Sequence, residues 1–335
     1  MQTIYKGALA ALAIALLGSA PSGAHGFDFN FGSWHTHIKL LAHPFTGPQR
    51  WLTYDGTVNV RPVWNGAAGV EEIDAAGPSR LEVLNVRMYD PRSGQWSLNG
   101  ADSTDGTLEA PLYGTFSNGR GTFYGQDAVD GRIALIRQTF FDITRSSYDF
   151  QEALSDDGGT TWKPDFVAHL TRIAARAPSE GRQTVADTSH AFDFNYGTWS
   201  THITTSGAKL AGTVAVRKIW NGRALMEEIH ASGAHGGFEG LTLFLYDPQS
   251  RQWSQTYADR SDATFERSMI GGFSDGRGVL TAFPSANQGT MQCVRDVWSD
   301  IKPDSHHFEV QYSSDGCATW KPAFVADLHR IAPGL

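Results

Sequence analysis

Short runs in which apolar and polar residues alternate make up most of this chain, and turn-forming residues separate them. Examples of such runs are residues 57–64, 84–89, 132–143, 148–154, 213–220, 241–246, 291–301 and 306–312. The separating turns include Asn65-Gly66, Asn118-Gly119 and Asp130-Gly131. No stretch sustains the 3.6-residue apolar period of an amphipathic helix. Alternation with Gly, Asn and Asp between the runs predicts antiparallel β structure, with helix confined to short turns.

The chain repeats itself at the scale of a domain. Residues 27–34 (FDFNFGSW) return as residues 192–199 (FDFNYGTW), about 165 residues later, and further matching blocks follow in the same order. This period is far longer than the roughly 20 to 50 residues of solenoid repeats. The sequence therefore predicts two tandem domains, residues 25–173 and 192–335. A polar, small-residue-rich linker over residues 174–191 (AARAPSEGRQTVADTSHA) joins them.

Each copy is long enough for one hydrophobic core, and its strands must either close on themselves or split into two layers. A meander of hairpins that opens with a Gly-x-Trp segment favours an up-and-down β-barrel in each copy, with a β-sandwich as the alternative. A small barrel of this kind has room inside for side chains and one small ligand.

The first 24 residues have the pattern of a secretory signal. Lys6 supplies a positive charge, residues 7–17 an apolar core, and Ser22-Gly23-Ala24 a small-residue cleavage site. The apolar core is about half of the ~20 residues that a membrane span requires. We therefore expect a mature chain that begins near His25 and is exported to the periplasm or the extracellular space, without a membrane span.

The charge balance is acidic. The full chain has 27 basic and 35 acidic side chains and a formal charge of −8, which becomes −9 when Lys6 is removed with the signal. This balance argues against nucleic acid or an anionic membrane surface as a partner. Oligomeric state stays open.

Both cysteines, Cys293 and Cys317, lie in the second copy. Alignment of the copies places Leu135 and Gly159 opposite them, so both cysteines are present in one copy and both absent from the other. Export permits a disulfide, and a hairpin could bring the two together. We predict a structural disulfide, against the alternative of two unrelated small apolar residues.

Charged residues on mainly apolar strand faces are the candidate chemistry. Alternation places Glu71 and Arg137 among apolar neighbours in the first copy, and Glu227 and Arg295 in the second. Because an unpaired buried charge is costly, we expect Glu71 to pair with Arg137, and Glu227 with Arg295. Each pair is either a structural ion pair or part of a pocket. In a pocket, Arg would anchor a ligand carboxylate or hydroxyl and Glu would act as general base.

The ordered motifs resemble a family of poorly characterised bacterial lipocalin-like (calycin-type) domains. The motifs are a Phe-x-Phe-x-x-Gly-x-Trp opening, a Trp-x-Gly turn, a Glu-Glu strand, Tyr-Asp-Pro followed by Trp, and a closing Ser-x-Asp-x-x-x-Thr-Trp. They occupy residues 27–34, 64–66, 71–72, 89–96 and 155–162, and again 192–199, 220–222, 227–228, 246–253 and 313–320. The resemblance implies the barrel fold, and no catalytic residue is carried over from it.

The closing motif is also similar to the Asp-box hairpin of sialidase propellers. A propeller would need this box on several blades of about 40 to 50 residues, whereas each copy here has one. We therefore predict a hairpin at this motif and reject a sialidase propeller as the fold.

Side chains that could line a barrel interior are the candidate ligand-binding residues: Trp34, His37, Arg87, Tyr89, Trp199, His202, Phe244 and Tyr246. His37 and His202 each recur three residues after the opening Trp, which leaves a haem bound by a single His as an alternative. His35 stands two residues before His37, but Ser200 takes its place in the second copy, so the copies share only a single His. A single His is weak evidence for a metal or haem site, and we expect no metal and no cofactor.

Three functions remain from the sequence. The favoured one is an exported tandem barrel that binds a small, partly apolar molecule in one or both copies. The second is an acid/base enzyme of isomerase, lyase or hydratase type that uses a Glu/Arg pair. The third is an envelope interaction module without a small ligand.

Overall fold

The protein is an all-β chain in the computed structural model, which describes residues 22–103, 106–173, 190–205, 207–287 and 290–334. The side chains of residues 283–291 are outside this description. So are residues 1–21 of the predicted signal and residues 174–189 of the predicted linker. No helix in the described part of the chain has the length and apolar character to cross a membrane.

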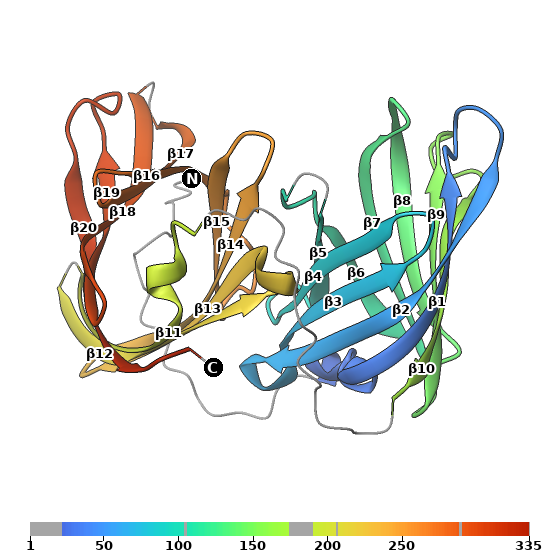
Figure 1. The fold of residues 1–335 in the computed structure, drawn as a ribbon, viewed down its shortest axis with the longest axis horizontal. Coiled ribbons are helices and arrows are strands. Elements are labelled where there is room, and N and C mark those ends of the chain that lie inside the picture. The colour runs from blue at the N-terminus through green and yellow to red at the C-terminus, as the bar shows by residue number, and fades with distance from the viewer. Residues whose placement is uncertain (1–21, 104–105, 174–189, 206, 288–289, 335) are drawn as a thin grey trace. The chain divides into compact units, whose positions relative to one another are not determined.

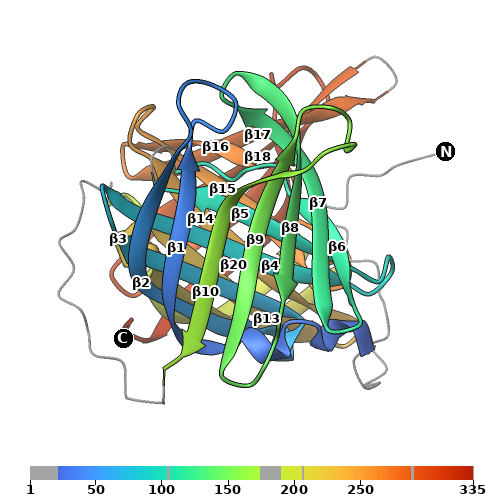
Figure 2. The same ribbon diagram turned by 90° about the vertical axis from the view of Figure 1, so that its right-hand side faces the viewer.

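The first repeat forms a closed barrel of ten antiparallel strands, which we call barrel 1 (Figures 1 and 2). Sequential strands are neighbours, and the barrel closes where β1 pairs with β10 from Trp34↔Arg172 to Leu40↔Phe166. Its strands are β1 (Gly32–Ala42), β2 (Arg50–Val63), β3 (Ala68–Ala76), β4 (Arg80–Asp90), β5 (Gln95–Asp102), β6 (Leu112–Ser117), β7 (Arg120–Val129), β8 (Arg132–Phe141), β9 (Ser147–Ser155) and β10 (Lys163–Arg172). Its 3₁₀ turns are η1 (Ser22–His25), η2 (Asp28–Asn30) and η3 (Trp64–Gly66).

The second repeat forms barrel 2, which has the same up-and-down order and closes where β11 pairs with β20. Its strands are β11 (Gly197–Thr205), β12 (Ala208–Ile219), β13 (Ala224–Gly233), β14 (Gly236–Asp247), β15 (Gln252–Asp259), β16 (Met269–Ser274), β17 (Arg277–Asn287), β18 (Thr290–Lys302), β19 (Ser305–Ser313) and β20 (Lys321–Ala332). Its 3₁₀ turns are η4 (Asp193–Asn195) and η5 (Trp220–Gly222). The predicted tandem barrels are confirmed, and the sandwich alternative is wrong.

Tight turns at the predicted positions join neighbouring strands. Asn118-Gly119 links β6 to β7 with φ angles of 52° and 73°, and Asp130-Gly131 links β7 to β8 with φ angles of 51° and 75°. Positive φ at both central residues is typical of type I′ turns, whose twist matches that of the flanking strands. Asn, Asp and Gly tolerate this backbone better than other residues, which is why these pairs predicted the hairpins.

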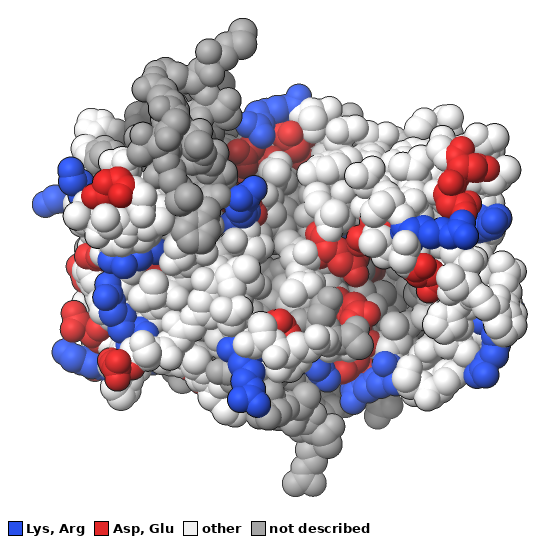
Figure 3. All heavy atoms as spheres, turned by 90° about the horizontal axis from the view of Figure 1, so that it is seen from above, with Lys and Arg blue, Asp and Glu red and all other residues white. Residues whose placement is uncertain are grey.

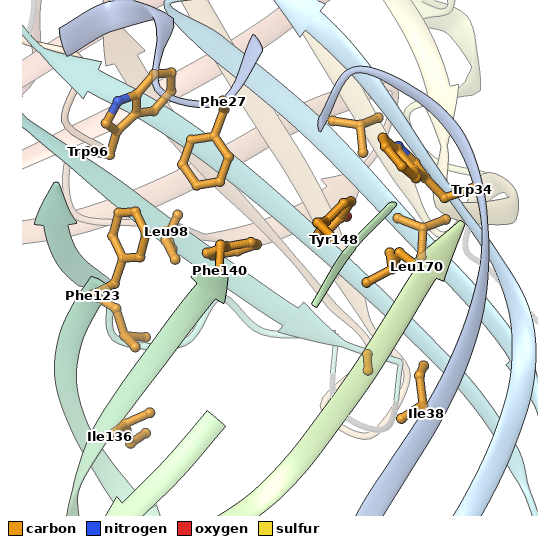
Figure 4. Close-up of a cluster of buried hydrophobic side chains, with 14 of the residues drawn as sticks. Phe27, Trp34, Ile38, Trp96, Leu98, Phe123, Ile136, Phe140, Tyr148 and Leu170 are labelled. Carbon is orange, nitrogen blue, oxygen red and sulfur yellow. The ribbon is translucent and has the colours of Figure 1, made fainter. Parts of the chain in front are cut away.

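One end of each barrel is filled by aromatic side chains from the segment that precedes its first strand. In barrel 1, Phe27 is buried and contacts Trp96, Phe123 and Phe140 with ring centroids 4.9, 5.6 and 5.2 Å away (Figure 4). Phe192 occupies the same place in barrel 2. We call this segment, residues 27–31 or 192–196, the plug.

An arginine of the last strand holds the plug against the first strand. The Arg172 guanidinium lies 4.0 Å from the Trp34 ring centroid and donates to the carbonyl oxygens of Phe31 and Phe29 at 2.7 and 2.5 Å. The Trp34 indole donates to the Asn30 carbonyl at 2.7 Å. Barrel 2 repeats the arrangement with Arg330, which lies 4.0 Å from the Trp199 ring.

The closing motif of each copy forms the expected hairpin turn. In barrel 1, Asp157 accepts hydrogen bonds from Ser155 and from the backbone and hydroxyl of Thr161, which lower its pKa to about 2. In barrel 2, Cys317 occupies the position of Gly159, with a positive φ of 69°, and forms a disulfide with Cys293 across a Cα separation of 5.6 Å. The predicted cysteine pairing is therefore present in the structure.

The disulfide should stabilise barrel 2 through the loop that it closes. For a sequence separation of 24, the chain-entropy model predicts a contribution of about 3 kcal/mol. The variant Cys293→Leu/Cys317→Gly copies the residues of barrel 1 and removes the cross-link while it keeps an apolar contact. We expect its free energy of unfolding, from denaturant titration, to fall by about 3 kcal/mol. Dithiothreitol should lower the free energy of unfolding of the wild-type protein by a similar amount and leave that of the variant unchanged. Equal unfolding midpoints for the oxidised and the reduced wild-type protein would contradict this role.

Candidate functional site

Charges on the surface are mixed. On the face drawn in Figure 3, acidic and basic side chains alternate in small groups, and no large basic patch is visible there. A shallow hollow of about 440 Å³ lies on the outside of the β6–β7 hairpin, lined by Thr115, Ser117, Asn118, Arg120, Thr122 and Tyr124. It is remote from the buried polar groups, which lie inside the barrels.

Barrel 1 contains a buried ion pair between neighbouring strands. Glu71 on β3 pairs with Arg87 on β4, and their side chains are only 6% and 4% exposed. Arg87 also donates to Asn30 Oδ1 at 2.5 Å, and Glu71 accepts from Asn85 at 3.0 Å. Asn30 in turn donates to the hydroxyl of Tyr148 at 2.5 Å. Glu71 and Arg87 thus neutralise each other's charge, and each forms a further hydrogen bond. This arrangement offsets the cost of burying an ion pair.

The predicted pairing of Glu71 with Arg137 and of Glu227 with Arg295 is wrong. Arg137 faces outward and lies 4.5 Å from the Trp162 ring centroid. Arg295 likewise lies 4.1 Å from the Trp320 ring and donates to Gln311. Both faces of β8 and β18 carry apolar residues, so alternation alone could not identify the interior face. Leu135 and Phe141, the apolar neighbours that suggested burial of Arg137, lie on the outward face of β8 with it.

Barrel 2 has the same glutamate without the arginine. The position of Arg87 is taken by Phe244, a buried residue whose ring centroid lies 4.7 Å from that of Phe192. Glu227 accepts hydrogen bonds from Asn195 at 3.2 Å and Thr242 at 3.1 Å. Its pKa is raised because the surrounding protein removes water from the carboxylate. No salt bridge to Glu227 is found among the described residues.

The missing arginine leaves a buried acceptor unsatisfied. Asn195 Oδ1 corresponds to Asn30 Oδ1, which accepts a hydrogen bond from Arg87 in barrel 1. In barrel 2 this atom is buried and has no hydrogen-bond partner among the described residues. The position of Tyr148 is taken by His306, whose ring is packed 4.6 Å from that of Trp199. Burial and the nearby Arg330 lower the pKa of His306 to about 3, so this ring is neutral at pH 7.

A second carboxyl group is buried inside barrel 2. Asp296 on β18 is 3% exposed, and burial raises its pKa to about 8. Gln255 on β15 donates to it, yet Asp296 Oδ1 and Gln255 Oε1 both lack a partner among the described residues. Nearby Glu266 has its pKa raised to about 7 by burial and by repulsion from Asp262 and Asp259. The interior of barrel 2 therefore holds three carboxyl groups with raised pKa values, Glu227, Glu266 and Asp296.

Barrel 1 has its additional carboxyl groups elsewhere. Glu152 on β9 accepts from Gln138 at 2.7 Å and lies beside Asp165. Burial and the neighbouring Glu152 raise the pKa of Asp165 to about 8, and that of Glu152 is also raised by burial. The two carboxyls therefore hold at least one proton between them at pH 7, which lets one donate to the other.

The remaining predicted ligand-binding residues divide between core and surface. Trp34 and Trp199 are completely buried beneath the arginines of the last strands. Tyr89 and Tyr246 pack against Trp96 and Trp253 at ring-centroid distances of 5.6 and 5.4 Å. His37 and His202 are exposed on the outside, where His37 contacts Asp55 at 2.7 Å. In the described residues, no three His, Cys, Asp or Glu side chains come together as a metal site requires.

Several interior residues were missed by sequence reasoning. Asn30 and Asn195 belong to the repeated opening motif, and Asp296 shares a strand face with Val294 and Trp298. The signal for Asp296 was available, because a lone carboxylate between apolar residues at a spacing of two indicates a buried acid. Gln255 carried no such signal.

Comparisons with known proteins assign neither a family nor a function to this chain. No protein-family model matches the sequence, and no curated protein does. A protein of unknown function from the DUF3598 family of Nostoc punctiforme aligns over 93% of this chain and 100% of its own, with 12% identity and a TM-score of 0.24. A variant of transferrin binding protein B from Haemophilus parasuis aligns over 89% of this chain and 76% of its own, with 9% identity and a TM-score of 0.19. At these values neither likeness bears on function.

The fold and its interior define the class of this protein: two closed ten-stranded barrels in tandem, each with polar groups among aromatic side chains. Barrel 1 supplies a cation to its buried glutamate, and barrel 2 leaves the equivalent glutamate without one.

The two glutamates should respond differently to neutralisation. Glu71→Gln leaves Arg87 buried without its carboxylate, so we expect a loss of about 3 kcal/mol or more in the free energy of unfolding. The matched change Glu227→Gln removes no ion pair and should cost about 1 kcal/mol or less. Denaturant titration of both variants checks the contrast. Equal costs would show that Glu71 and Arg87 do not depend on each other.

The stability of barrel 2 should decrease as pH rises. Because the pKa of Asp296 is about 8 in the folded protein and about 3.8 when unfolded, the folded state holds a proton that the unfolded chain releases. The contribution of Asp296 to the free energy of unfolding is fully present below about pH 4 and is lost as pH rises toward 8. Over this range the folding equilibrium constant falls by up to about tenfold for each pH unit.

Asp296→Asn removes this titration, so unfolding midpoints at pH 5, 6.5 and 8 should fall less steeply for the variant than for wild type. A residual slope of the same sign should remain, because burial also raises the pKa of the facing Glu227 and Glu266. Identical pH profiles for the two proteins would contradict a protonated Asp296.

Proposed function

We propose that the protein is exported and holds a small, partly apolar molecule inside barrel 2. The observation that carries this proposal is a set of buried polar atoms that have no hydrogen-bond partner among the described residues, and this set includes Asn195 Oδ1, Gln255 Oε1 and Asp296 Oδ1. Buried polar atoms in native proteins are hydrogen-bonded with few exceptions. Unsatisfied polar atoms on the inside of one barrel therefore favour an additional molecule that forms hydrogen bonds with them.

The surroundings of these atoms suit an apolar body. Phe192, Phe244 and Trp298 are packed together beside the glutamate, with Phe244 and Trp298 ring centroids 6.1 Å apart. Farther along the interior face, Phe308 and Phe324 are only partly buried. A bound molecule could cover these rings and gain roughly 25 cal/mol for each Å² of apolar surface removed from water.

Barrel 1 is proposed to have a supporting role. Its glutamate, arginine and plug asparagine satisfy one another, so the same position needs no ligand there. Asp165 Oδ1 also has no hydrogen-bond partner among the described residues, but this carboxyl belongs to a proton-sharing pair near the β9–β10 turn.

Export is supported by the signal pattern of residues 1–24 and by the cysteine pair. A disulfide persists in oxidising compartments outside the cytoplasm, and Cys293 and Cys317 are paired in the structure.

An acid/base enzyme on the same scaffold is the second candidate. It is favoured by one observation: with pKa values of about 8 and 7, Asp296 and Glu266 can both exchange protons near neutral pH. Turnover of the bound molecule during incubation with the protein would distinguish this function from simple binding.

Native mass spectrometry of the mature protein, purified gently from its own host, tests the proposed function. We expect one small molecule per chain. The variant Gln255→Leu, which copies Leu98 of barrel 1 and removes one unsatisfied acceptor, should lose most of it. Glu152→Gln changes an interior carboxyl of barrel 1 and should retain it. A bare mass for wild type under conditions that preserve non-covalent complexes would contradict the proposal.

A further inference from the structure

We propose that the ligand of barrel 2 is an organic cation, with an amidinium, guanidinium or ammonium group on an apolar body. This inference rests on the proposed function and names the chemical class of the ligand. It comes from a comparison that the chain itself provides, because the two barrels share a framework and differ in one interior charge.

Barrel 1 shows what the framework binds. There the Arg87 guanidinium pairs with Glu71 and donates to Asn30 Oδ1. Phe27 and Phe140 flank the guanidinium at 4.5 and 5.2 Å from their ring centroids. A carboxylate, an amide oxygen and two aromatic faces thus surround one planar cation.

Barrel 2 retains most of these groups and lacks the cation. Glu227 and Asn195 take the places of Glu71 and Asn30, and aromatic rings again stand beside them as Phe192 and Trp298. The arginine is replaced by Phe244, whose ring fills the space over Phe192. Asn195 Oδ1 consequently has no donor among the described residues. A ligand cation would bind on the side of Glu227 that faces Asp296, where Gln255 Oε1 and Asp296 Oδ1 also have no partner among the described residues.

The sign of the charge follows from the groups that face this position. Glu227 from β13, Asp296 from β18 and Glu266 from the β15–β16 loop are carboxyls that influence one another. The other titratable groups are Tyr257 and Tyr312, whose pKa values are raised, and the neutral His306. Because burial raises the pKa values of Asp296 and Glu266, these carboxyls hold protons when no cation is near. A cation with N–H donors would favour their ionised forms and pair with them, whereas an anion would find no opposite charge among them.

Three molecules of nearly the same shape test the inference by isothermal titration calorimetry on the full mature protein. Benzamidine is cationic, benzamide is neutral, and benzoate is anionic. We expect benzamidine to bind at least tenfold more tightly than benzamide, and benzoate not to bind measurably.

Variants place the binding in barrel 2. Glu227→Gln should weaken benzamidine at least tenfold, while Glu152→Gln in barrel 1 should leave its affinity unchanged. Phe244→Arg supplies the guanidinium that barrel 1 carries and should abolish benzamidine binding in a protein that still melts cooperatively. Glu227→Gln, which replaces a carboxyl by an amide of the same size, keeps the test decisive if Phe244→Arg does not fold.

The outcomes separate the inference from the proposed function. Equal affinities for benzamidine and benzamide would contradict a cationic ligand. An affinity for benzamidine that is unchanged by Glu227→Gln would contradict it as well. A neutral or anionic molecule in the native mass spectrum overturns it as well, while the proposed function stands. If none of the three probes binds and the native mass is bare, the proposed function fails and the inference fails with it.

Discussion

The contact on which each barrel depends is the arginine of its last strand against the tryptophan of its first. Arg172 covers Trp34 and binds the plug carbonyls, so a single side chain joins β10, β1 and the plug. Arg330 and Trp199 do the same in barrel 2. A barrel has no free edge only if its first and last strands stay paired. A charged group that donates to several carbonyls across this junction holds it closed and fixes the plug.

The plug matters for the interior because it carries an asparagine inward. The Trp34 indole holds the Asn30 carbonyl, and this directs the Asn30 amide toward Arg87 and Tyr148. Asn195 is held in the same way by Trp199 at 2.8 Å. The two barrels therefore present equivalent amide groups on equivalent frameworks, and the difference between them lies in a few side chains. Duplication preserved the closure and changed the interior charge, which is the basis for assigning the barrels different roles.

Much of the fold could be predicted from the sequence. The repeat, the alternation and the turn pairs lead to tandem up-and-down barrels, and the comparison of copies identified the pairing of Cys293 with Cys317. The alternation and the turn pairs are local patterns that occur in both copies, whereas the cysteine pair was found because the first copy lacks both cysteines.

The site was less predictable, for a physical reason. Alternation correctly placed Glu71 on an interior face, but it could not choose between Arg87 and Arg137 as its partner. Arg137 has apolar neighbours at a spacing of two, but it lies with them on the outward face, where it packs on the ring of Trp162. Arg87 was recognised only as a residue that could line a pocket. Pairing across strands depends on register and on strand tilt, and neither is encoded in the spacing of residues along one strand.

The most direct test of the account is a high-resolution crystal structure of the protein purified gently from its own host. The account predicts electron density for a non-protein molecule inside barrel 2, within hydrogen-bond distance of Asn195 Oδ1 and Asp296, and none at the Arg87 position of barrel 1. An interior in which water or rotated protein side chains satisfy these acceptors would contradict the claim that barrel 2 is completed by a ligand.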